Sequence, residues 1–218
     1  MTLEQAQLDF GIDLGAEEST SAVWVDLPGL TAVAKPKGVV YTKRWVVDLI
    51  LDLAGYRSSE DLAARYAVEP SAGEGAFLLP MIQRLLDSAE QHGRSLDDVR
   101  NALHAYELDE GSATLAIGLA TEELLSRGVD SKTATEMAQG WVTTGDYLLD
   151  SPRDRKADFV VGNPPYIRYD DLPEGAFEAY RRIYPTMVGR CDIYVGFIEA
   201  GMRQLTEHGV LAFICADR

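Results

Sequence analysis

Short apolar segments with the composition of buried strands alternate with helix-length segments along most of the chain. The strand segments are residues 66–70, 103–108, 141–146, 157–163 and 209–215. Such alternation is the pattern of right-handed βαβ units, which place their strands side by side in a parallel sheet. We therefore predict an α/β fold of five strands. Ligands of such folds bind at the carboxyl ends of the strands, near the point where the strand order reverses.

The local signals between the strands predict several helix boundaries. Thr42 is expected to cap a helix that Gly55 ends, and Ser58 with Asp61 has the spacing of a capping box for a short second helix. Further helical segments are expected over residues 76–91, 110–128 and 193–209, the last of them directly before the last strand. The main irregular insertion is expected from Ile167 to Arg190.

Charge divides the chain into two parts. The first 34 residues carry six acidic side chains and no Lys or Arg, so residues 1–34 are predicted to be a solvated leader or a partner-docking arm. Residues 35–218 then form the globular part. The formal net charge of −15 argues against strong non-specific binding of nucleic acid by this chain alone. With no signal peptide and no membrane-length apolar run, we expect a cytoplasmic location.

The cysteines and histidines do not indicate a metal site. The three histidines show no metal-ligand spacing with Cys191 and Cys215, so no metal is expected. Cys215 lies in a stretch with the composition of a buried strand, and we expect its thiol to be buried.

Two glycines follow the first strand segment. Gly73 and Gly75 bracket Glu74 in a turn that leads into a helix, where glycine allows a sharp turn and close approach of a ligand to helix N–H groups. The third glycine of a dinucleotide fingerprint and the Lys-Ser/Thr of a P-loop are missing. This pattern favours a nucleoside ligand other than NAD or ATP, although a plain strand-to-helix turn would have the same residues.

Two carboxylates follow the next two strands. Glu107 lies where an acidic residue could accept hydrogen bonds from both ribose hydroxyls, and the alternative is a solvated acid at a strand end. Asp146 could accept a proton from an adenine amino group, and the alternative is a helix N-cap.

The fourth strand segment ends on Asn163-Pro164-Pro165-Tyr166. Two consecutive prolines fix φ and remove N–H donors, so the backbone leaves the strand stiff and rich in acceptors. The Asn163 side-chain oxygen and the Pro164 carbonyl suit the two hydrogens of a planar exocyclic amine, and Tyr166 can stack on the ring that carries it. Strand termination alone would explain one proline but not the tetrapeptide.

These motifs resemble those of the S-adenosylmethionine-dependent amino methyltransferases, whose catalytic signature is (D/N/S)PP(Y/F). The resemblance is strongest to the N6-adenine DNA methyltransferases of the gamma motif order, found in restriction-modification and phage-defence systems. It covers roughly Lys37 to the C-terminus. The matching segments, in the family's order, are residues 36–51, 68–78, 106–109, 144–148, 163–168 and 192–214.

The resemblance implies a Rossmann-like class I methyltransferase fold and a role for each motif. Asn163, Pro164, Pro165 and Tyr166 would grip a flipped adenine. The residues implied in binding S-adenosyl-L-methionine are Thr42 at the methionine carboxylate, Glu69 in place of the commoner Asp, Gly73, Gly75, Glu107, Asp146, and Phe197 against the cofactor's adenine.

The family's sheet has seven strands, and the sequence predicts five. We therefore expect residues 35–218 to be the N-terminal part of the catalytic domain, without its last two strands, and expect DNA contacts and restriction or defence subunits to involve regions outside this chain. Two alternatives remain. One is methylation of a protein glutamine amide or an RNA guanine N2 amine, since those families share the motif. The other is a cofactor-binding module without catalysis.

Overall fold

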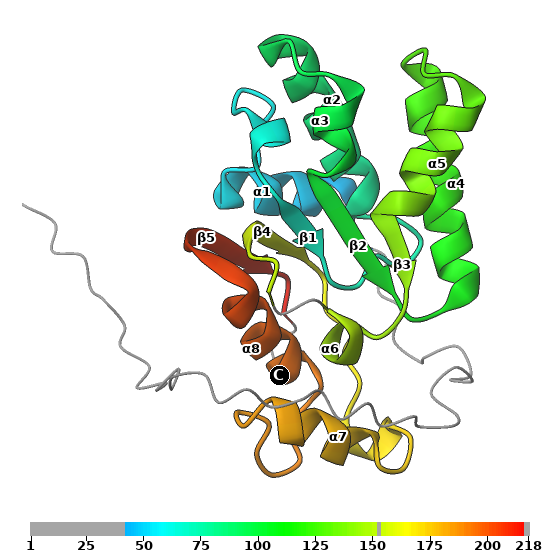
Figure 1. Cartoon of the computed structure of the whole chain (residues 1–218). Helices are drawn as coiled ribbons and strands as arrows, with labels where there is room; N and C mark the ends of the chain where they lie inside the picture. The colour runs from blue at the N-terminus through cyan, green and yellow to red at the C-terminus, as the bar shows by residue number, and fades with distance from the viewer. Residues whose placement is uncertain (1–41, 152–153, 216–218) are drawn as a thin grey trace, which may run out of the picture.

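The described part of the chain is a three-layer α/β/α structure. The computed structural model describes residues 42–151 and 154–215, so the predicted acidic leader, residues 1–34, lies outside them. A sheet forms the middle layer, and helices cover both of its faces (Figure 1). None of the helices in these ranges is both long enough and apolar enough to span a membrane.

The sheet has five parallel strands, which confirms the predicted fold class and strand count. The strands are β1 (Ala67–Glu69), β2 (Leu103–Glu107), β3 (Val142–Thr144), β4 (Ala157–Gly162) and β5 (Leu205–Phe213). They lie in the order β3-β2-β1-β4-β5, and every neighbouring pair is parallel. The order reverses between β1 and β4, so a ligand crevice is expected at the carboxyl ends of these two strands.

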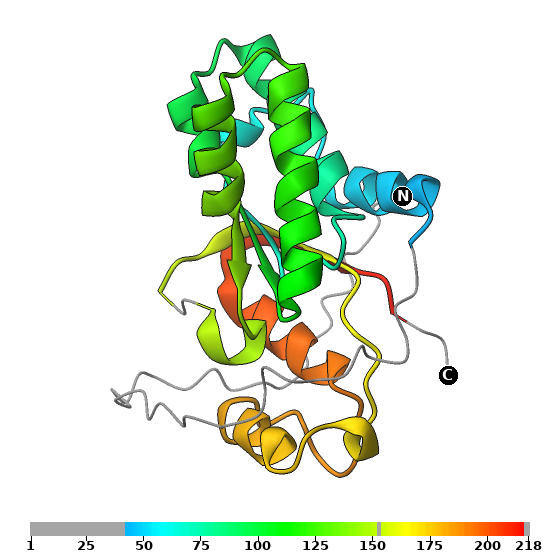
Figure 2. The same cartoon turned by 90° about the vertical axis from the view of Figure 1, so that its right-hand side faces the viewer.

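The helices lie in two groups on opposite faces of the sheet (Figure 2). The first group is α1 (Arg44–Ala54), α2 (Leu78–His92), α3 (Leu96–Arg100), α4 (Glu110–Ser126) and α5 (Ser131–Trp141). The second group is α6 (Tyr147–Asp150), α7 (Ala176–Ile183) and α8 (Tyr194–Gln204).

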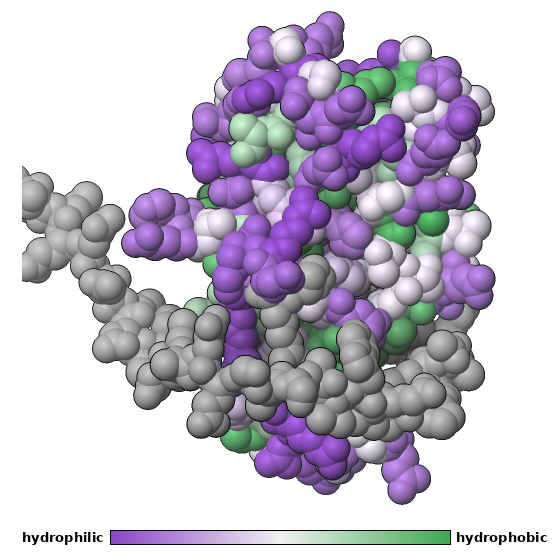
Figure 3. Space-filling model, in the orientation of Figure 1, coloured by the Kyte–Doolittle hydropathy of each residue, from purple (hydrophilic) through white to green (hydrophobic). Residues whose placement is uncertain are grey.

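Each face of the sheet has its own hydrophobic core, because neighbouring strand side chains point to opposite faces. Ala67 and Val161 pack in the core under the first helix group, whereas Val68 and Val160 pack in the core under the second. On the side seen in Figure 3, hydrophilic residues cover most of the coloured surface. The apolar pattern that predicted the strands therefore reflects burial between the layers.

Several predicted boundaries are wrong. The helix before β5 ends at Gln204 and not at residue 209, and an irregularity in the β4–β5 pairing takes up the extra residues. Gly209 fits there because an added Cβ would lie 2.7 Å from the Ala157 carbonyl oxygen. The insertion Ile167 to Arg190 is not wholly irregular, since it contains α7.

Gly55 ends α1 as predicted, in the left-handed conformation, but the predicted N-caps differ from those observed. Lys43, and not Thr42, is the N-cap of α1, and it makes no side-chain capping bond. Asp61 precedes a 3₁₀ turn, again without a side-chain capping bond, whereas a capping box forms at Ser95 before α3. Cys215 is exposed, because β5 ends two residues before it.

Candidate functional site

The glycine turn after β1 has the backbone conformation that glycine allows. Gly73 and Gly75 both have positive φ, 54° and 94°. An added Cβ on Gly75 would lie 3.3 Å from the Leu119 side chain, so the turn also packs closely on α4. A Cβ on Gly73 would meet no atom of the described residues within 4 Å, so within that part of the chain the turn faces open space at this residue. The turn thus presents backbone to a space at the carboxyl end of β1.

Glu107, the last residue of β2, is tied to this turn. Its Oε2 accepts a hydrogen bond of 2.7 Å from the Gly73 N–H, and its Oε1 accepts one of 2.8 Å from the Asp109 N–H. Partial burial raises the pKa of the Glu107 carboxyl, and these N–H donors act in the opposite direction. The structure therefore joins two predicted site residues from different strands.

Glu69, the last residue of β1, is buried, with only 1% of its surface exposed. Its Oε2 has no hydrogen-bond partner within the described residues. Burial and the nearby charge of Glu107 raise the pKa of Glu69 well above its usual value. A buried polar atom without a partner is costly, so it marks a place where a bound polar group could supply the missing hydrogen bond.

Asp146 is the N-cap of α6, as the alternative prediction for this residue had it. Its carboxylate also accepts a hydrogen bond from the Tyr180 hydroxyl. Its Oδ1 accepts from the Leu148 N–H at 2.9 Å, and its Oδ2 accepts from the Tyr180 hydroxyl at 2.6 Å. Burial raises the pKa of Asp146, while the Tyr180 hydrogen bond lowers it. A carboxylate oxygen has two lone pairs, so Oδ2 can accept one further hydrogen bond.

Phe197 lies in the core of the second face. It is 5% exposed, and its ring is stacked on Tyr147 with the centroids 5.6 Å apart. Through this stack, α8 contacts α6, the helix that Asp146 caps.

Asn163 and Tyr166 form a connected group beyond β4. The Tyr166 hydroxyl lies 2.8 Å from both Asn163 Oδ1 and the Ile214 carbonyl oxygen, and it can donate its single proton to either. Asn163 Nδ2 donates to the Thr42 hydroxyl at 3.1 Å. Pro164 is buried and Pro165 partly buried, and neither follows a cis peptide bond. The structure therefore places Thr42 beside the predicted catalytic amide.

The two groups meet at the reversal of strand order. An added Cβ on Gly162 would lie 3.3 Å from Pro70 and 3.6 Å from Glu69, so the ends of β1 and β4 approach closely. The glycine turn with Glu107 and Asp146 lies on the β1-β2-β3 side, and Asn163 with Thr42 lies on the β4-β5 side.

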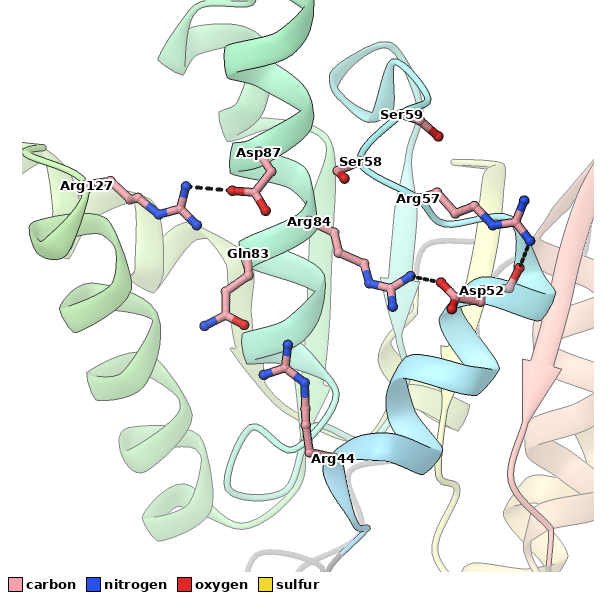
Figure 4. A pocket seen from close by; sticks show the side chains of 9 residues that line it. All are labelled: Arg44, Asp52, Arg57, Ser58, Ser59, Gln83, Arg84, Asp87 and Arg127. Atoms are coloured by element: carbon pink, nitrogen blue, oxygen red, sulfur yellow. Dashed lines mark hydrogen bonds and ion pairs between the residues drawn. The ribbon is translucent and has the colours of Figure 1, made fainter.

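An arginine-rich hollow lies away from the strand ends, between α1, α2 and the end of α4 (Figure 4). It is not an unpaired cationic site, because each guanidinium in it already contacts an oxygen acceptor. The pairs are Arg44 with Asp48, Arg57 with the Asp52 carbonyl, Arg84 with Asp52, and Arg127 with Asp87. We therefore assign the candidate site to the strand ends.

Two residues of this site were not predicted from the sequence. Tyr180 lies in α7, and its hydroxyl donates to Asp146, the N-cap of α6. Tyr184 is the C-cap residue that follows α7, and its hydroxyl donates a 2.8 Å hydrogen bond to the Leu148 carbonyl of α6. The sequence did contain a signal for α7. Buried apolar and aromatic residues alternate there with exposed charged ones such as Arg181 and Arg182, which is typical of a helix that packs one of its faces against the protein.

The chain is similar to known restriction-modification proteins. A family model described as Eco57I restriction-modification methylase matches residues 90–218. The chain is 42% identical over 185 residues to the type II methyltransferase M.PaeR7I of Pseudomonas aeruginosa, which covers 84% of this chain and 32% of that protein. It is 40% identical over 186 residues to the type II methyltransferase M.XhoI of Xanthomonas vasicola, and this match covers 84% of this chain and 34% of that protein.

The chain therefore spans about a third of the length of these curated relatives. Among solved structures, the methyltransferase subunit of a type I restriction-modification system from Streptococcus thermophilus superimposes with a TM-score of 0.53 and 19% identity. That match covers 84% of this chain and 35% of the other, and it supports the class I methyltransferase fold.

Proposed function

The chain belongs to the Eco57I restriction-modification methylase family, and on this premise we propose that it is part of an adenine-specific DNA methyltransferase. The proposed reaction is methyl transfer from S-adenosyl-L-methionine to the exocyclic N6 amine of an adenine flipped out of the duplex. One observation carries the proposal: Asn163-Pro164-Pro165-Tyr166 leaves β4 at the reversal of strand order, opposite the glycine turn of β1.

The residues at the ends of β1, β2 and β3 suit the cofactor. Gly73 and Gly75 open the backbone to it, Glu107 offers acceptors for ribose hydroxyls, and Asp146 offers one for an adenine amine. The buried Oε2 of Glu69, at the end of β1, supports this fit, because it has no hydrogen-bond partner within the described residues and a polar ligand could supply one. When bound, the cofactor supplies an electrophilic methyl group on a sulfonium.

Two further residues have proposed cofactor roles. Thr42 would touch the methionine carboxylate while its hydroxyl accepts from Asn163 Nδ2, so it would link cofactor and catalytic amide. Phe197, of which 5% is exposed, would contact the cofactor's adenine.

The target amine would be held by two acceptors. An exocyclic amine is a poor nucleophile because its lone pair is delocalised into the ring. Hydrogen bonds to Asn163 Oδ1 and the Pro164 carbonyl would hold its nitrogen nearer tetrahedral geometry and restore the lone pair. Unstacking the base costs a few kcal/mol, which stacking on Tyr166 would partly offset. Most of the rate gain would then come from positioning the amine.

The observed hydrogen bonds allow this exchange of partners. Asn163 Oδ1 lies within hydrogen-bond distance of the Tyr166 hydroxyl, whose proton can turn to the Ile214 carbonyl, also 2.8 Å away. The amine can therefore take Asn163 Oδ1 without leaving the tyrosine hydroxyl unsatisfied. The Thr42 contact keeps the amide nitrogen of Asn163 turned away from the base.

The partners follow from charge and from the share of the relatives that the chain spans. We propose that residues 35–218 are the N-terminal part of the catalytic domain and residues 1–34 an acidic leader. DNA recognition would lie in regions outside this chain, because a net charge of −15 opposes contacts to phosphates. We propose a cytoplasmic location, where a restriction-modification enzyme meets DNA.

Calorimetric titration with S-adenosyl-L-homocysteine tests the cofactor assignment on this chain. We expect saturable binding that Asn163→Ala leaves within a few-fold, because Asn163 would contact the target amine and not the cofactor. A chain that is folded by circular dichroism but binds neither this nucleoside nor S-adenosyl-L-methionine would contradict the proposal.

A further inference from the structure

The helix that follows the catalytic tetrapeptide returns to the cofactor side of the site. Tyr180 of α7 is 2% exposed, and its hydroxyl donates a 2.6 Å hydrogen bond to Asp146 Oδ2. The opposite oxygen of the same carboxylate accepts from the Leu148 N–H. Both oxygens of Asp146 are thus fixed, one by its own helix and one by α7.

A second tyrosine joins the same two helices. The hydroxyl of Tyr184, the residue that follows α7, donates to the Leu148 carbonyl oxygen. The end of α7 therefore contacts α6 through a charged acceptor, Asp146, and an uncharged one, the Leu148 carbonyl. Both tyrosines belong to the buried core of the second face, and Figure 1 shows α6 and α7 on that side of the sheet. The pair offers a matched comparison, because both are buried tyrosines of one segment, and the Tyr180 hydroxyl donates to a predicted ligand-binding residue whereas the Tyr184 hydroxyl donates to a backbone carbonyl.

We propose that Tyr180 is a positioning residue for the cofactor. It holds the Asp146 carboxylate ionised and turned so that Oδ2 can accept the exocyclic amine of the cofactor's adenine. This inference rests on the proposed function, because it concerns the same nucleoside site. It also joins the two halves of that site, since the segment that carries Tyr180 begins directly after the residues that would grip the target base.

The charges around Asp146 give this role a pH signature. Burial and the Asp150 carboxylate raise the pKa of Asp146, and the Tyr180 hydrogen bond lowers it. Removing that hydroxyl takes away one of the lowering causes and leaves the backbone N–H groups of Leu148 and Leu149 as the others, so the pKa of Asp146 rises further. Binding that needs the carboxylate is lost as pH falls through this pKa. In a Tyr180→Phe variant the loss must therefore begin at a higher pH than in the wild-type chain.

The test compares Tyr180→Phe with Tyr184→Phe in the 218-residue chain. S-adenosyl-L-homocysteine affinity is measured by calorimetry from pH 4 to pH 9, and the Asp146 carboxyl is titrated by ¹³C NMR without ligand. For Tyr180→Phe we expect binding about tenfold weaker near neutral pH, as for a lost charge-assisted hydrogen bond. The acid limb of binding and the NMR titration should both move to higher pH. Tyr184→Phe should bind within about twofold of wild type, with neither curve displaced.

Two outcomes separate this inference from the proposed function. If the wild-type chain binds S-adenosyl-L-homocysteine and Tyr180→Phe has the same affinity, pH profile and Asp146 titration, the inference about Tyr180 is wrong and the proposed function stands. An equal loss of affinity at every pH in both tyrosine variants also overturns it, because the tyrosines would then only stabilise the fold. A wild-type chain that binds no S-adenosyl-L-homocysteine at any pH overturns the proposed function, and this inference with it.

Discussion

Glu69→Gln should change how the stability of the chain depends on pH. Glu69 is 1% exposed, and burial and the charge of Glu107 raise the pKa of its carboxyl well above the usual value. In the folded chain the carboxyl thus remains protonated at pH values where it is ionised in the unfolded chain. A group of this kind contributes most stability at low pH and loses it as pH rises.

The size of the effect follows from linkage. Between the unfolded pKa, near 4.5, and the raised folded pKa, the wild-type chain loses about 1.4 kcal/mol of unfolding free energy for each pH unit. Glutamine resembles the neutral acid but does not ionise, so the variant should not show this loss. Its new amide hydrogens cost about 1–3 kcal/mol if they stay unsatisfied, and that cost is the same at every pH.

Urea unfolding at pH 5, 6, 7 and 8 measures this difference. We expect the stability of Glu69→Gln relative to wild type to increase steadily with pH from pH 5 upward. The exposed Glu122→Gln is the matched control and should stay within about 0.5 kcal/mol of wild type throughout. If the difference in unfolding free energy between Glu69→Gln and wild type stays constant from pH 5 to pH 8, the pKa of Glu69 is not raised by folding, because a constant difference means that Glu69 ionises alike in the folded and unfolded chains.

Three further predictions concern the proposed reaction. Asn163→Ala in the complete protein should lower kcat by raising the activation barrier by roughly 2–4 kcal/mol, because the lost hydrogen bond strengthens in the transition state. Near-normal turnover of this variant would show that Asn163 is not catalytic. Glu107→Ala should weaken S-adenosyl-L-methionine binding to this chain by about 1.5–3 kcal/mol in calorimetry, and unchanged affinity in a folded variant would take Glu107 out of the site. In a gel-shift titration at physiological salt, this acidic chain should show little DNA affinity, so tight, site-specific binding would place the recognition surface here.

The sheet was predictable because its strands are short, apolar and separated by helix-length segments. Their carboxyl ends meet at one edge of a parallel sheet, so residues such as Glu107 and Asn163 could be placed at that edge from the chain order alone. The helix α5 was missed, although its buried residues recur at helical spacing: Ala134, Met137, Ala138 and Trp141. An Asp130 N-cap precedes them, so the signal for this helix was present.

The rest of the site depends on contacts between distant segments. The Tyr180 bond to Asp146 joins residues 34 apart, and the Asn163 bond to Thr42 joins residues 121 apart. Local pattern carries no information on such pairs. The exposure of Cys215 was mispredicted for a related reason, because an apolar stretch does not show at which residue the strand pairing stops.

We propose that the complete protein methylates the N6 amine of adenine in DNA. The direct measurement is to incubate that protein with duplex DNA and S-adenosyl-L-methionine labelled in the methyl group, digest the DNA to nucleosides and identify the labelled product by mass spectrometry. We expect label in N6-methyldeoxyadenosine with wild type and, in the same short incubation, at least about 30-fold less with Asn163→Ala, which corresponds to a barrier raised by about 2 kcal/mol. Label in a cytosine product, in protein or in RNA, or equal label from Asn163→Ala, would contradict the proposal.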